Sequence, residues 1–284
     1  MSENQEENIS ACNYIVAFID ILGQKENLEK FPKLILDDID MQSLEESIRE
    51  TYAKKYKICN LANKWFKDNR YLQNNVHEII LSGKREGVNI EYWGDAIVVY
   101  SKLAPSPRDI DLREVYNIIS GCACFMLIML SENIAIRGGV EIGVALDKLD
   151  FGIYGSALYG AYELAEHIAG YPRIVVGEEL IKFLSSRSSE NYLDKINQGL
   201  AKKCLDLICE DEGDGRKIID FLNCAPIENP NSQNFKNVIS KGSKFVNSEF
   251  EKFKKDKNSK LAFRYALLKD YYLTRLNDLG ITIK

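Results

Sequence analysis

The first hundred residues alternate between short apolar runs and a segment with a helical repeat. The run NYIVAFIDIL at 13–22 is β-branched and aromatic with one charge near its end, as expected of a central strand buried on both faces. Leu and Ile recur among Lys and Glu over 26–67, which predicts helix. The pattern further predicts short strands at 77–84, 88–92 and 96–101. Trp93-Gly94-Asp95 is the tight turn that joins the last two into a hairpin.

Helices and strands continue to alternate in the middle of the chain. The pattern predicts helices at 110–132, 157–169 and 178–185, and strands at 134–146 and 172–176. Segments 204–209 and 217–223 flank a Gly-rich acidic loop, which suits a second hairpin. After a short linker, an apolar stripe within 235–279 predicts helix packed on the domain. We therefore expect an α+β domain over residues 1–225 and a C-terminal helical extension over 226–284.

The composition of the chain allows a buried core, and the protein as a whole is acidic. Hydrophobic residues make up 45% of its 284 residues, the formal net charge is -5 and the pI is about 5.4. We therefore expect no nucleic-acid partner and no membrane. The acidic N-terminus is unlike a secretory signal, and the longest apolar run, 118–130, is too short to span a bilayer. Seven Cys without a CxxC pair indicate reduced thiols in a cytoplasmic protein.

Two aspartates stand in apolar surroundings, where a lone carboxylate is costly. Asp20 lies near the end of the first expected strand, and Asp95 lies at the tip of the hairpin. Neighbouring strands are only about 5 Å apart, so the two side chains can converge on a divalent metal. Hard oxygen ligands select Mg²⁺ or Mn²⁺, which keep several waters and bridge to substrate phosphates. We therefore predict that Asp20 and Asp95 form a metal site that binds a nucleoside triphosphate.

The residues directly after Asp20 add a possible phosphate-binding turn. Backbone N–H groups of Ile21, Leu22 and Gly23 stand between a strand and a helix, where they can hold phosphates as helix N-termini do. The alternative is that Asp20 caps the next helix and Asp95 only fills a turn. For either aspartate alone we favour that alternative; for both in these contexts we favour the metal site.

Several short motifs along the chain resemble those of a known family. FIDILG at 18–23, followed much later by GDAIVVY, resembles the catalytic domain of class III adenylate and guanylate cyclases. Together with RGGVEIG at 137–143, YGSALYGAYELAE at 154–166 and YPRIVVG at 171–177, the chain looks more narrowly like the pyrimidine cyclases of bacterial anti-phage defence. The resemblance covers roughly residues 13–185.

The resemblance implies a ferredoxin-like βαββαβ cyclase core, followed by the C-terminal hairpin and helical extension. Such cores form head-to-tail homodimers with two composite active sites at the interface. Asp20, Asp95 and the carbonyl of Ile21 would bind two Mn²⁺ or Mg²⁺ ions. The 3′-hydroxyl of UTP or CTP would attack the α-phosphate, giving the 3′,5′-cyclic nucleotide and pyrophosphate. A separate effector would sense the cyclic product.

Further residues are implied to contact the nucleotide. Phe18, Leu22, Gly23 and Trp93 flank the metal ligands. Glu91, four positions before Asp95, stands where class III enzymes place a base-reading residue. A carboxylate accepts hydrogen bonds only, so Glu91 would serve uracil N3–H and the cytosine amino group alike. Its alternative is a solvated residue of the hairpin.

The helix after Gly155 departs from purine cyclases at two positions. Tyr159 stands where those enzymes carry the Asn that positions the ribose, which resembles the pyrimidine branch. Glu163 stands where they carry an Arg on the phosphates, and a carboxylate there repels a triphosphate. Arg137 and Arg173 are the candidates for the missing cation. The alternative for Arg173 is a surface ion pair with a Glu.

We therefore compare three functions. The first, which we favour, is a metal-dependent pyrimidine nucleotidyl cyclase that makes a defence messenger. The second is a cyclase-like protein that binds a nucleotide with weak or no turnover, as Glu163 would explain. The third is a polymerase-like enzyme, which shares the two-aspartate chemistry but needs a basic nucleic-acid channel that the acidic balance argues against.

Overall fold

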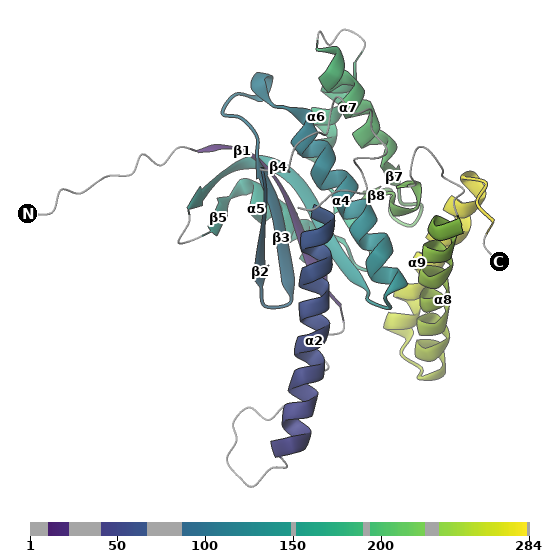
Figure 1. The fold of residues 1–284 in the computed structure, drawn as a ribbon. Helices are drawn as coiled ribbons and strands as arrows, with labels where there is room; N and C mark the ends of the chain where they lie inside the picture. Colours follow the sequence, from purple (N-terminus) through teal and green to yellow (C-terminus); the bar gives the residue numbers. More distant parts are fainter. Residues whose placement is uncertain are drawn as a thin grey trace, which may run out of the picture.

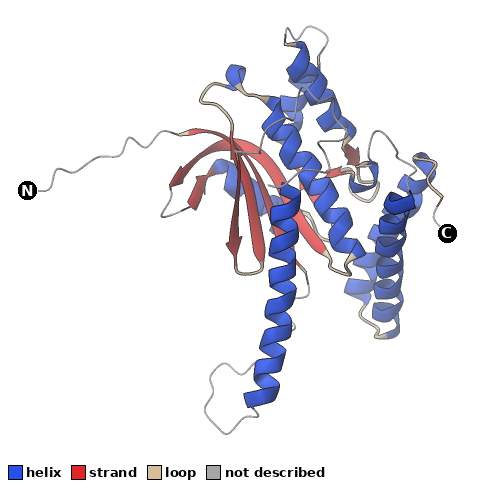
Figure 2. Ribbon diagram, viewed as in Figure 1, coloured by secondary structure: helices blue, strands red, loops and turns tan. Residues whose placement is uncertain are grey.

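The computed structural model describes residues 11–22, 41–66, 87–148, 152–189, 194–224 and 233–282. They form a mixed α+β fold in which helices pack on a mostly antiparallel open sheet (Figures 1 and 2). The strands are β1 (Cys12–Ile21), β2 (Val88–Trp93), β3 (Ala96–Lys102), β4 (Ile136–Lys148), β5 (Gly152–Gly155), β6 (Ile174–Val176), β7 (Ile208–Glu210) and β8 (Lys217–Ile219). The helices are α2 (Met41–Phe66), α4 (Leu112–Ser131), α5 (Ser156–Glu163), α6 (Glu178–Ser188), α7 (Lys195–Asp206), α8 (Gln233–Lys255) and α9 (Ser259–Asp278). Short 3₁₀ turns lie at η1 (Pro107–Asp109) and η3 (Phe221–Asn223), and a π-helical turn at η2 (Leu164–Ile168).

The sheet runs in the order β2-β3-β1-β4-β6-β8-β7, with β5 paired to the end of β4. β1 is antiparallel to both of its neighbours, β3 and β4, and β2 is antiparallel to β3. The pairing of β4 with β6 is parallel, and the remaining pairs are antiparallel. The register places Asp20 opposite Ala96 on one side and Arg137 on the other.

Helices cover both faces of β1, as its continuous apolar run predicts. Ile15, Ala17 and Ile19 belong to the large core cluster that includes the apolar residues of α4. The alternate residues, such as Val16 and Phe18, belong to a second cluster with the small residues of α5. The prediction of a central strand at 13–22 is therefore confirmed.

α5 packs very closely on β4, and glycine makes this approach possible. A Cβ atom on Gly139 would lie 2.3 Å from the carbonyl oxygen of Ala161 and 2.4 Å from the Cβ of Leu164. α5 contributes Ala157 and Ala161 to the contact and η2 contributes Ala165, and all three are fully buried. The RGGVEIG segment thus serves packing, and it holds α5 and its π-helical turn against the strand that carries Arg137.

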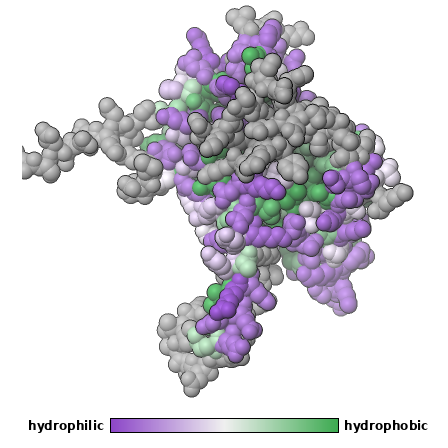
Figure 3. All heavy atoms as spheres, viewed as in Figure 1, coloured by the Kyte–Doolittle hydropathy of each residue, from purple (hydrophilic) through white to green (hydrophobic). Residues whose placement is uncertain are grey.

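α4 is the core helix of the domain. Of the helices in the described ranges, it alone is long and apolar enough to cross a membrane, but 83% of that stretch is buried inside the fold. Polar and charged side chains predominate among the coloured atoms of the face in Figure 3. These features are those of a soluble protein. All seven cysteines lie within the described residues, and none forms a disulfide.

The structure differs from the predicted elements in the last third of the chain. Cys204 lies in α7 and not in a strand, so the second hairpin is shorter than expected. The C-terminal segment is two helices, because α8 ends at Lys255 and the side chain of Asn258 caps α9 by accepting from Leu261 N at 3.2 Å. Their apolar residues join the main core cluster. The strand predicted at 77–84 lies outside the described residues.

Replacing Gly139 with Ala tests the close contact between α5 and β4. Overpacking of this kind costs about 1–3 kcal/mol, so Gly139→Ala should lower the free energy of unfolding by that amount in urea denaturation. Gly199→Ala is the matched control, because no atom lies within 4 Å of a Cβ at this position of α7. It should stabilise the protein by about 0.5–1 kcal/mol. Equal effects of the two substitutions would contradict the packing role of Gly139.

Candidate active site

Asp20 and Asp95 lie at the same edge of the sheet. Asp20 is near the end of β1, and 17% of its side chain is exposed. Asp95 is the exposed last residue of the β2–β3 turn, where Gly94 has a φ of 59°. The N–H of Ile21 donates to the carbonyl oxygen of Asp95 at 3.3 Å and so ties the turn to the end of β1. The register therefore brings together the two aspartates that the sequence singles out.

Arg137 is the direct partner of Asp20. Its Nε donates to Asp20 Oδ2 at 2.8 Å, and its Nη2 donates to Glu166 Oε2 at 2.5 Å. Burial raises the pKa of the Asp20 carboxyl, Arg137 opposes that rise, and the charges of Asp95 and Glu166 add to it. The charges of two further carboxylates thus act on Asp20, and Arg137 bonds to Asp20 and to one of the two, Glu166. This arrangement favours the arrival of a further cation.

The donor set fits a hard divalent ion. Two carboxylates and the backbone carbonyl of Ile21 are oxygen ligands, and such ions complete their coordination with water and substrate phosphates. Within the described ranges, no group of three His, Cys, Asp or Glu side chains could by itself hold a metal ion. Any ion at Asp20 and Asp95 would therefore depend on ligands from water or a bound nucleotide.

Glu166 was missed by the sequence reasoning. It lies in the π-helical turn η2 that continues α5, and a π-turn takes an extra residue compared with an α-turn. An α-helical projection of 157–169 therefore does not show which residue faces Arg137. The sequence holds no other signal for this contact.

Phe18 and Tyr159 lie on different sides of α5. Phe18 is 8% exposed and meets the ring of Tyr162 edge-on, with 5.4 Å between centroids. Tyr159 is 64% exposed, and the neighbouring charge of Glu163 raises the pKa of its hydroxyl. The Nε2 atom of His167 lies 3.7 Å from Glu163. Within one chain, Tyr159 and Glu163 face outward and do not join Asp20.

Glu91 is already bonded on both carboxylate oxygens. It accepts from Trp93 Nε1 at 2.9 Å, from the hydroxyl of Tyr100 at 2.7 Å and from the backbone N–H of Ile153 at 3.2 Å. Burial and the bond to Glu91 raise the pKa of Tyr100. Glu91 therefore ties β2, β3 and β5 together, and a nucleobase would have to replace one of these bonds.

Arg173 has no donor left for a phosphate. It is 4% exposed, and its five N–H groups donate to Asp211, to Asp214 and to the carbonyls of Ile168 and Ala169. Its guanidinium also lies 4.6 Å from the centroid of the Tyr171 ring. The ion pair is buried and joins the β7–β8 loop to the end of η2. Of the two predicted cations, Arg137 alone lies beside Asp20.

Leu22 and Gly23 are the remaining residues that the sequence predicts to contact the nucleotide. Leu22 is half-buried in the turn after β1, where its N–H donates to the carbonyl of Ala135 at 3.0 Å. Gly23 lies outside the described residues, so the predicted phosphate-binding turn is described only as far as Leu22.

The structural role of Arg173 predicts a large loss of stability when it is removed. Breaking a buried ion pair leaves a buried charge unpaired, which costs about 3–5 kcal/mol. We expect Arg173→Ala to lower the free energy of unfolding by that amount in urea denaturation. Arg113→Ala, which breaks an exposed pair with Asp111, should cost less than about 1 kcal/mol. A stable Arg173→Ala protein that has lost only nucleotide binding would instead support a phosphate role.

Comparison with known proteins found no matching family model and no matching curated protein.

Proposed function

We propose that the chain is a metal-dependent nucleotidyl cyclase that converts UTP or CTP to the 3′,5′-cyclic nucleotide and pyrophosphate. One observation carries the proposal: the hydrogen bond from Ile21 N to Asp95 O, at 3.3 Å, ties the turn that carries Asp95 to the end of β1, where Asp20 is half-buried. The partial burial of the Asp20 carboxylate costs stability, and binding of a divalent ion with a triphosphate would explain why it stands beside a second aspartate.

The sheet supports the cyclase core that the motifs imply. Strands β4-β1-β3-β2 are neighbours in that order, each antiparallel to the next. In the chain they follow as β1, α2, β2, β3, α4, β4. This order and direction support a ferredoxin-like βαββαβ core, in which Asp20 and Asp95 would bind the metals.

The residues at the end of β1 would have separate roles in the cyclisation. Asp20, Asp95 and the carbonyl of Ile21 would hold two Mn²⁺ or Mg²⁺ ions, which when bound lower the pKa of the 3′-hydroxyl and neutralise the phosphates. The 3′-oxygen forms a bond to the α-phosphorus, the bond to the pyrophosphate oxygen breaks, and the hydroxyl proton passes to solvent. Arg137 holds the Asp20 carboxylate in place, and its charge lies beside the triphosphate.

A homodimer would complete the site. α5 and the neighbouring β5 carry exposed aromatic side chains, with Tyr154 74%, Tyr159 64% and Tyr162 39% exposed. A head-to-tail partner would cover this surface and bring its Tyr159 to the ribose of the nucleotide held by Asp20 and Asp95. The cyclic product would then act in the cytoplasm on a separate effector of anti-phage defence.

A second function, nucleotide binding with weak or no turnover, is favoured by one specific observation. The guanidinium beside the metal site, Arg137, is bonded to Asp20 and Glu166, and Glu163 adds another carboxylate to the same helical segment. A triphosphate at this edge would then meet more acidic than basic side chains, and only the metal ions would offset the repulsion.

Product analysis with each nucleoside triphosphate tests the proposal. With Mn²⁺ we expect cyclic UMP or cyclic CMP by mass spectrometry, and a loss of about 10³-fold in kcat for Asp20→Asn and for Asp95→Asn. Asp270→Asn, which changes an exposed carboxylate on α9, should keep the full rate. Absence of cyclic product from all four triphosphates would reject the cyclase, and calorimetric binding without product would establish the second function.

Arg137 also predicts an effect on metal binding in the absence of nucleotide. A guanidinium beside Asp20 opposes a divalent cation, so Arg137→Gln should bind Mn²⁺ about fivefold more tightly, as measured by electron paramagnetic resonance of free Mn²⁺. Arg113→Gln, on the exposed pair with Asp111, should leave the affinity unchanged. Weaker binding by Arg137→Gln would show that Asp20 needs this partner to keep its orientation.

A further inference from the structure

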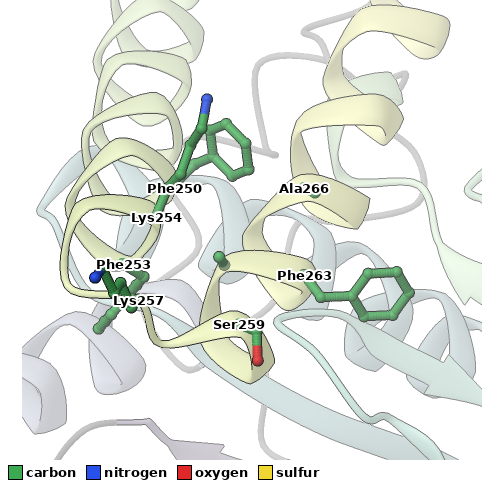
Figure 4. Close-up of a pocket in the computed structure, with 8 residues that line it drawn as sticks. Phe250, Phe253, Lys254, Lys257, Ser259, Phe263 and Ala266 are labelled. Atoms are coloured by element: carbon green, nitrogen blue, oxygen red, sulfur yellow. The ribbon is translucent and has the colours of Figure 1, made fainter.

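A groove lies between the end of α8 and the start of α9, far from the cyclase motifs in the chain (Figure 4). Its volume is about 440 Å³, within the range of roughly 300–1,000 Å³ typical of small-molecule sites. The walls are mainly apolar, and two lysines stand among them. The lining residues are Phe250, Phe253, Lys254, Lys257, Ser259, Ala262, Phe263 and Ala266.

The groove exposes a large aromatic side chain. Phe263 is 64% exposed, whereas Phe253 is held in place by stacking on Tyr265, with 5.6 Å between ring centroids. The ring of Phe250 has the Nζ of Lys254 at 5.8 Å and the Nζ of Lys269 at 5.1 Å from its centroid. The apolar wall is therefore bordered by positive charge.

The two lysines of the groove lack acidic partners. Lys252, on the same turn, pairs with Glu249 at 3.3 Å. No carboxylate of the described residues forms an ion pair with Lys254 or Lys257. The whole segment is basic: residues 233–282 hold eleven Lys and Arg against five Asp and Glu, while the rest of the chain holds 26 against 37. This charge is available to an anionic ligand.

Lys257 occupies a backbone position that glycine usually takes. Its φ is 56°, in the left-handed region, and its N–H donates to Lys254 O at 3.2 Å to close the end of α8. Glycine adopts this conformation at helix ends without steric cost, whereas lysine is strained there. A strained residue of this kind points to a use for its side chain, and here the side chain lies at the groove.

We propose that this groove binds an anionic amphiphile with a single acyl chain, the chain lying along the apolar wall and the carboxylate or phosphate bonding to Lys257, while Lys254 adds positive charge beside Phe250 (Figure 4). Charge complementarity favours this occupant, because two unpaired ammonium groups stand beside an apolar wall. The volume of the groove suits one chain. The proposal does not depend on the cyclase activity, since neither helix carries a residue of the Asp20 edge.

Calorimetry with dodecanoate and dodecyl phosphate, on the full chain, tests this site. We expect either anion to bind, and dodecyltrimethylammonium, with the same chain and the opposite charge, not to bind. Lys257→Gly should weaken binding about tenfold, the effect of losing one bond to a charged group. It should also keep or raise the unfolding midpoint, because it relieves the left-handed strain, so a loss of binding could not come from misfolding.

Lys255→Ala is the matched control, because Lys255 is an exposed lysine of α8 that does not line the groove. It should leave the dissociation constant within about twofold. Equal binding of the cationic amphiphile, or equal losses in Lys255→Ala and Lys257→Gly, would overturn the proposal. Binding only to vesicles of phosphatidylcholine and phosphatidylglycerol would also overturn it, because α8 and α9 would then contact a membrane surface. Binding only to an acidic peptide would overturn it as well.

Discussion

The burial of β1 on both faces is the constraint from which the rest of the structure follows. Its side chains alternate between a cluster with α4 and a cluster with α5, and its backbone is paired on both edges. Polar chemistry can therefore occur only where the strand ends. Asp20 stands at that end, and the turn that carries Asp95 is bonded to the next residue. A strand that is packed on both faces thus positions the candidate metal ligands, as precise placement of reacting groups requires.

Charge at this edge is balanced through Arg137. The guanidinium joins a carboxylate of β1 to a carboxylate of the π-helical turn; Arg137 and Asp20 are largely buried, whereas Glu166 is exposed. Gly139, two residues further along β4, lets α5 approach closely enough for Glu166 to reach this arginine. Packing and electrostatics are therefore coupled. A shift of α5 would move Glu166 away from Arg137, and the loss of that ion pair would change the electrostatic potential at Asp20.

Local patterns in the sequence predict the elements that depend on local physics. An uninterrupted apolar run indicates β1, and the Trp-Gly-Asp turn indicates the hairpin. Partners that depend on register could not be predicted, because Arg137 meets Asp20 across 117 positions of chain. Glu166 depends on a π-turn that an α-helical repeat does not describe. The burial of Arg173 depends on how the loop containing Asp211 and Asp214 folds back, so the sequence left a phosphate contact and an ion pair equally open.

The acidic balance of the whole chain says little about any one of its surfaces. Charges separated by more than about 10 Å are largely screened at ordinary ionic strength. The acidic edge at Asp20 and the basic segment 233–282 therefore attract ions independently of each other. The same net charge of -5 therefore accommodates a candidate site for divalent cations at Asp20 and a helical segment, 233–282, with an excess of six basic residues. An argument from net charge weighs against a long nucleic-acid channel, which needs an extended basic surface. Net charge does not predict whether a groove with two lysines binds a small anion, because binding of a small anion depends on the charges close to it.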